Sequence, residues 1–120
     1  MNNNRPEKED LSKEISMADS LMQLNSIQGL LDNKEQYIDS INFENLYIAR
    51  TSFIQLLTKN VNSEQIEDFE SKIDLIDSVF VLTRDYYISL SEWYLENYLD
   101  SMSYDCNQKV DFLNEYINKF

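Results

Sequence analysis

Carboxylates dominate the side chains of this protein that could do chemistry. The 120-residue chain has 22 Asp and Glu residues against ten Lys and Arg residues, which gives a formal net charge of −12 at pH 7. Histidine is absent, and the only thiol is that of Cys106. The commonest general base, the commonest metal ligand and every Ser–His or Cys–His catalytic pair are therefore missing.

The acidic residues form no known catalytic or metal-binding motif. Residues 100–111 are rich in acids, but they lack the Gly at position 6 and the Glu at position 12 of a calcium-binding EF-hand. Zinc sites need Cys and His clusters, di-iron bundles use Glu-x-x-His, and phosphate-binding loops need several glycines, whereas Gly29 stands alone. No spacing singles out a pair of carboxylates for hydrolysis. We expect a protein that is not an enzyme and that binds no metal or other cofactor.

The negative charge is concentrated in one segment. Residues 60–108 hold eleven acids but only two bases, Lys72 and Arg84, and so contribute −9 to the net charge. Like charges four residues apart on a helix, such as Glu92 and Glu96, destabilise that helix. A cationic partner would turn this repulsion into attraction and would speed association.

The same segment is rich in aromatic residues, with six of the fifteen in residues 86–104. Tyr86, Trp93 and Tyr98 cannot all share one helical face, so at least one should reach the surface. Trp and Tyr among charged residues are typical of the energetic centre of a protein interface. The competing interpretation is that the acids are a solvated face and the tyrosines are core. The residues predicted to bind a partner are Glu70, Asp74, Asp77, Asp85, Tyr86, Glu92, Trp93, Glu96, Tyr98 and Asp100.

The elements that must position these residues are predicted to be helices. One Gly and one Pro in the whole chain leave too few turn residues for a β-sandwich or a barrel, and no apolar run is long enough to span a membrane. We expect an all-α fold, an antiparallel helical bundle of about four helices. Residues 11–120 would form a single domain and residues 1–10 a flexible tail.

Capping residues and apolar spacing place the first two helices. An apolar stripe predicts one helix from about residue 11 to Gly29. Asp32 and Glu35 have the spacing of a capping box, so the next helix is expected to begin there after a short connection. This second helix should extend to Lys59, with an interruption near residues 40–42.

A long central helix is the clearest prediction. Asn62 and Gln65 have capping-box spacing, and apolar residues then recur every three or four positions. The helix is predicted to cover residues 63–99, either continuously or with a bend at residues 83–85. Residues 100–107 are expected to form a connection, with Asp105 and Gln108 in capping positions before the last helix.

These features favour an interaction protein in the cytoplasm. No secretory signal is visible in the first 20 residues, and a single cysteine forms no disulfide within the chain. The charge disfavours direct binding to nucleic acid or to an anionic membrane. In size, charge and helicity the chain is similar to small acidic immunity proteins that neutralise nuclease toxins, and to acidic phage proteins with an anti-defence role.

We therefore expect an inhibitor or immunity-type protein that occludes a basic surface of another protein. The partner would be a nuclease, a defence effector or another nucleic-acid-binding protein. The alternative is a self-associating helical adaptor, or another structural or regulatory interaction protein. A homodimer of that kind would place Phe80, Tyr87 and Tyr94 against a second chain.

Overall fold

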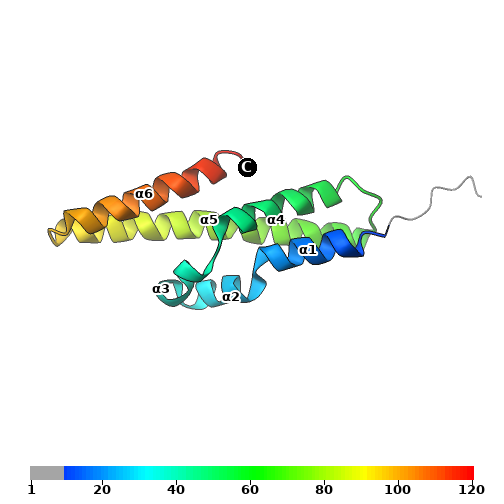
Figure 1. The fold of residues 1–120 in the computed structure, drawn as a ribbon, viewed down its shortest axis with the longest axis horizontal. Helices are drawn as coiled ribbons and strands as arrows, with labels where there is room; N and C mark the ends of the chain where they lie inside the picture. The colour runs from blue at the N-terminus through cyan, green and yellow to red at the C-terminus, as the bar shows by residue number, and fades with distance from the viewer. Residues whose placement is uncertain (1–9) are drawn as a thin grey trace, which may run out of the picture.

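The computed structural model describes residues 10–120, and every regular element within them is helical (Figure 1). The predicted all-α helical bundle with one long helix is confirmed. The tail predicted for residues 1–10 lies, except for Asp10, outside the described residues. The elements are α1 (Ser12–Met22), α2 (Leu24–Asp32), α3 (Lys34–Tyr37), the 3-10 helix η1 (Ile38–Ser40), α4 (Phe43–Leu56), α5 (Ser63–Glu96) and α6 (Asp100–Ile117).

The long helix α5 begins where the sequence predicts. The side chain of Asn62 accepts a hydrogen bond from the backbone N–H of Gln65 (2.8 Å), and the backbone N–H of Asn62 donates to the Gln65 side chain (3.0 Å). The capping box is therefore present. The helix continues through residues 83–85 without a break and ends three residues earlier than expected. Its 34 residues make a rod of about 51 Å.

The first predicted helix is in fact two helices, which is a correction to the sequence analysis. Gln23 separates α1 from α2 with a left-handed backbone, at φ 58° and ψ 48°. Its side-chain amide donates to the carbonyl of Asn42 and accepts from the N–H of Asn42, both at 2.9 Å. A partner 19 residues away thus stabilises a break that no Gly or Asn marks in the sequence.

The second predicted helix is interrupted, as expected, and its start is shifted. Asn33 is the N-cap of α3, and its side chain accepts a hydrogen bond from the N–H of Gln36 (3.2 Å). The predicted capping box of Asp32 and Glu35 is therefore wrong: the N-cap is Asn33, one residue later, and its backbone N–H donates to the carbonyl of Gly29 instead of to a side chain of α3. The interruption near residues 40–42 is confirmed by the end of η1 and the new start of α4.

Gly29 lies in the last turn of α2, three residues before the end of that helix. A Cβ atom at this position would lie 2.6 Å from the ring of Tyr37 in α3. The glycine therefore allows α3 to fold back closely against α2.

The predicted connection at residues 100–107 is helical. α6 starts at Asp100, so Asp105 and Gln108 lie within the helix and do not cap it. The N-cap residue is Leu99, whose side chain cannot accept a backbone hydrogen bond, so the boundary carries no capping signal. The first buried residues of α6 are Ser103 and Cys106, which is why the apolar pattern is weak here.

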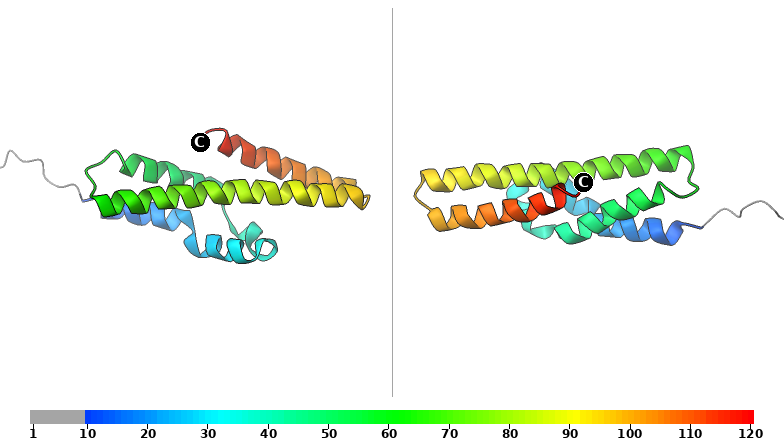
Figure 2. Two further views of the ribbon diagram at one scale, coloured as in Figure 1. Left: turned by 180° about the vertical axis from the view of Figure 1, so that it is seen from behind. Right: turned by 90° about the horizontal axis from the view of Figure 1, so that it is seen from above.

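The helices form two unequal halves along α5. α4 packs against the first half of α5, α1 packs mainly against α4, and α6 runs back along the second half of α5 (Figures 1 and 2). Phe80, near the middle of α5, is fully buried where the two halves meet. Its ring lies 5.3 to 5.6 Å, between centroids, from those of Phe43, Tyr116 and Phe120. This aromatic junction joins α4, α5 and the C-terminal end of the chain.

Candidate functional site

A tight turn closes the hairpin of α5 and α6. The N–H of Leu99 donates to the carbonyl of Tyr94 (2.8 Å), and the N–H of Tyr98 donates to the carbonyl of Leu95 (3.1 Å), which is a Schellman motif. Tyr98 occupies the left-handed position of this motif, at φ 60°, where glycine is usual. That conformation costs a non-glycine residue about 1 kcal/mol. Because the Tyr98 side chain is 91% exposed, packing does not offset this strain.

Five of the ten predicted partner-binding residues lie together around this turn, which we call the hairpin tip: Glu92, Trp93, Glu96, Tyr98 and Asp100. Trp93 is 53% exposed although its ring touches that of Tyr94, with centroids 5.5 Å apart. The three carboxylates are exposed, and no Lys or Arg of the described residues forms an ion pair with them. The tip therefore combines available negative charge with exposed aromatic surface.

Three further apolar residues at the tip were not singled out from the sequence. Leu95, Leu99 and Met102 are all substantially exposed. Because residues 100–107 were expected to form a connection, the sequence analysis did not predict that α6 begins at Asp100, directly after the end of α5 at Glu96. The one feature of the sequence that could have indicated Leu95 is its spacing of seven residues from Ile88 in the same helix.

Glu70 and Asp74 lie on the first half of α5, far from the tip. Both are exposed, and neither forms an ion pair within the described part of the chain. Glu70 is 22 residues before Glu92, or about 33 Å along the helix. Asp74 and Glu92 are 18 residues apart, about five turns, so they point to the same side. Figure 2 (left) shows α5 in front of the other helices along its whole length.

Two of the predicted acids have partners inside the molecule. Asp77 accepts hydrogen bonds from the guanidinium group of Arg50 in α4, whose Cζ lies 4.1 Å from the centroid of the Phe120 ring. Asp85 pairs with the neighbouring Arg84 at 3.1 Å. Asp77 therefore belongs to the contact between α4 and α5, a relation that spacing along the chain does not reveal.

Tyr86, the remaining predicted residue, is half-buried rather than at the tip. Its ring packs edge-to-face on Tyr87, with centroids 5.8 Å apart. Burial, and then the charge of Glu35, raises the pKa of Tyr86. Burial also raises the pKa of Tyr87 to about 12, with a further contribution from Asp39. Both tyrosines therefore contribute to the packing of the second half of α5.

No family model, curated protein or solved structure matches this chain. A function must therefore be inferred from the surface and its chemistry. Within residues 10–120, no three His, Cys, Asp or Glu side chains are grouped closely enough to hold a metal ion. In the same residues, no helix has both the length and the hydropathy needed to cross a membrane.

Small polar residues hold the two helices together behind the tip. The hydroxyl groups of Ser91 and Ser103 lie 2.7 Å apart, and that of Ser91 also donates to Oδ1 of Asn107 (2.9 Å). Cys106 is buried beside them, and burial raises the pKa of its thiol. A protonated, buried thiol is a poor nucleophile, so the cysteine fits a packing role.

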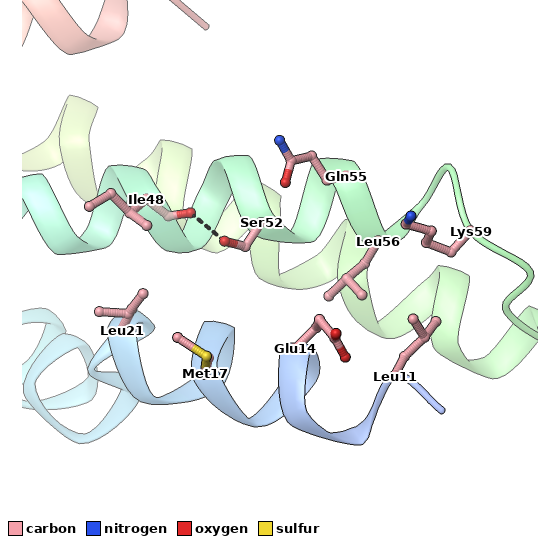
Figure 3. A pocket seen from close by; sticks show the side chains of 9 residues that line it. All are labelled: Leu11, Glu14, Met17, Leu21, Ile48, Ser52, Gln55, Leu56 and Lys59. Carbon is pink, nitrogen blue, oxygen red and sulfur yellow. Dashed lines mark hydrogen bonds between the residues drawn. The ribbon is translucent and has the colours of Figure 1, made fainter. Parts of the chain in front are cut away.

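A second candidate surface is a groove of about 380 Å³ between α1 and α4 (Figure 3). Met17, Leu21 and Ile48 give it an apolar lining, whereas Glu14 and Lys59 add charges of opposite sign. The groove thus lacks the single-sign charge of the hairpin tip, and it selects no partner by electrostatics.

Proposed function

We propose that this protein binds another protein through the hairpin tip and thereby blocks a basic, nucleic-acid-binding or nuclease-like surface. It would act in the cytoplasm as an inhibitor of the immunity or anti-defence type, without catalysis. The supporting observation is the presence of Glu92, Glu96 and Asp100, without ion pairs in the described residues, beside exposed Trp93 and Tyr98.

The physical argument combines two contributions to binding. Carboxylates that are not neutralised internally attract a cationic surface and raise the association rate. An exposed Trp and Tyr supply the apolar contact area that concentrates affinity in a few residues. The strained backbone at Tyr98 supports the same proposal, because strain that folding does not require is often found at binding sites.

Affinity capture from the source cell, followed by mass spectrometry, identifies the partner. We expect a protein with a basic surface, and we expect its dissociation constant to rise at least about tenfold between low salt and roughly 0.3 M salt. Changing Glu92, Glu96 and Asp100 together to Lys should weaken binding by roughly 100-fold or more, because attraction becomes repulsion.

The matched control changes Asp32, Glu44 and Glu115 to Lys, which alters the net charge equally at exposed sites away from the tip. This control should retain most of the affinity. Binding that is indifferent to salt and equally affected by both triple variants would contradict the proposed function.

The alternative, self-association through Phe80, Tyr87 and Tyr94, meets an obstacle in the fold. Phe80 and Tyr87 are buried within the chain, and Phe80 is surrounded by the rings of the aromatic junction. Light scattering on the purified protein separates the two ideas. A monomer is expected, whereas a stable dimer that protects Tyr94 would favour the adaptor.

A further inference from the structure

An apolar line extends from the hairpin tip along the open side of α5. Val81, Ile88 and Leu95 are seven residues apart, which places them on one face over about 21 Å. Val81 is half-buried, Ile88 is 38% exposed and Leu95 is 52% exposed. Apolar residues at heptad spacing form the stripe along which a second helix packs in coiled coils.

Acidic residues accompany this line. Asp85 and Glu92 follow Val81 and Ile88 by four residues, so each lies one turn further along the same side. Asp74 precedes Val81 by seven residues and continues the line as a charged position. Arg84, the one base of α5 in this stretch, pairs with Asp85 (3.1 Å) and also donates to Asn114 of α6 (3.3 Å). Asp74 and Glu92 have no such partner within the described part of the chain.

The charge distinguishes between the possible occupants of this face. A second copy would bring two chains, each with a formal net charge of −12, together along their most acidic helices. A partner helix with Lys or Arg on either side of its apolar stripe would instead bury Ile88 and Leu95 and neutralise Asp74 and Glu92, which form no ion pair among the described residues. Helix-in-groove recognition uses apolar residues spaced three, four and seven apart in this way.

We propose that the α5 face containing Val81, Ile88 and Leu95 binds a basic amphipathic α-helix of the partner. This inference rests on the proposed function for the sign of the partner's charge, and it adds the secondary structure and the apolar register of the bound segment. Tyr98, which follows Leu95 in the turn, would then contact the partner beyond the end of that helix, whereas Trp93 lies on another face of α5 and would contact a different part of the partner.

The test uses the full-length protein and a fluorescently labelled synthetic peptide. The peptide repeats Leu at heptad positions with Lys beside them, and binding is followed by anisotropy. Two further peptides serve as comparisons: a scrambled peptide of identical composition, and the amphipathic peptide with Gln in place of Lys. We expect the amphipathic basic peptide to bind at least tenfold more tightly than either.

A pair of exposed residues on α5 provides the variant and its control. Ile88→Asn should weaken peptide binding at least tenfold. Leu82→Asn should change it less than twofold, because Leu82 is 40% exposed but lies about a third of a turn away around the helix. Thermal melts of both variants should match that of the parent protein, since both sites are exposed.

Each contrary result has a distinct meaning. Equal binding of the amphipathic and scrambled peptides, equal effects of the two variants, or no binding of the amphipathic peptide would overturn the helix-docking inference. The salt-sensitive capture of a basic protein would stand in all three cases. Failure of that capture to respond to salt or to reversal of the tip charges would instead overturn the proposed function.

Discussion

Nine carboxylates lie on α5, and side chains of neighbouring residues decide which of them stay available. Lys72 forms ion pairs with Asp68 (2.9 Å) and with Asp19 of α1 (2.7 Å). Burial tends to lower the pKa of Lys72, but these two carboxylates raise it above its ordinary value. Such pairs join α1 to α5, whereas the tip carboxylates have no comparable partner among the described residues.

Tyr87 gives a prediction at the scale of one residue. Its pKa is about 12 in the fold and about 10 in an unfolded chain, so the folded state holds the proton more tightly. Its contribution to stability is therefore complete below pH 10 and is lost as the pH rises toward 12. Tyr87→Phe keeps the ring but removes this titration.

We expect the free energy of unfolding of Tyr87→Phe to fall less steeply between about pH 10 and pH 12 than that of the parent protein. Urea unfolding at a series of pH values measures both slopes. Identical slopes would show that the Tyr87 hydroxyl ionises equally easily in the folded and unfolded chains.

At the scale of the elements, the helix ends are determined in different ways. The start of α5 is fixed by local chemistry, because Asn62 and Gln65 satisfy each other's backbone N–H groups. The end of α1 depends instead on the hydrogen bonds between Gln23 and Asn42. The end of α5 uses Tyr98 where glycine would be less strained.

Tyr98→Gly is therefore expected to stabilise the protein by about 1 kcal/mol, because glycine adopts the left-handed conformation without strain. The same change removes an exposed ring from the proposed interface and should weaken partner binding about tenfold or more. Thermal unfolding and titration calorimetry with the captured partner measure the two effects. A loss of stability, or unchanged affinity, would contradict this assignment of Tyr98.

At the scale of the whole molecule, the two halves of α5 are supported unequally. The first half and the centre bury large side chains, among them Phe69, Ile76 and Phe80. Beyond Tyr87, the only buried residue of α5 is Ser91, which contacts Ser103 of α6. The second half therefore gains less from apolar burial.

Hydrogen exchange should reveal this difference. We expect backbone amides of residues 90–105 to exchange roughly tenfold or more faster than those of residues 73–84, because local opening requires the loss of fewer apolar contacts. Mass spectrometry of peptic fragments resolves the two segments. Equal exchange rates of the two segments in the free protein would argue against a less stable tip. Binding of the partner should slow exchange at the tip more than at the centre.

The sequence alone was sufficient for the features that depend on local chemistry and composition. The scarcity of Gly and Pro and the regular apolar spacing predicted an all-α bundle. The capping box at Asn62 predicted the start of the longest helix. Its apolar spacing predicted the approximate extent of that helix but left open a bend at residues 83–85, which the structure does not have. The absence of His and the excess of acids in residues 60–108 favoured a binding protein over an enzyme.

Only the tertiary structure decided which residues meet. Gln23 breaks a helix because Asn42 accepts and donates from 19 residues away, and Arg50 of α4 removes Asp77 from the open acidic face. The sharp turn at Tyr98 brings Trp93 and Asp100 to one tip, although the turn contains no glycine that would have predicted it. Local patterns record what a segment prefers by itself, whereas these outcomes depend on hydrogen bonds and charges supplied by distant parts of the chain.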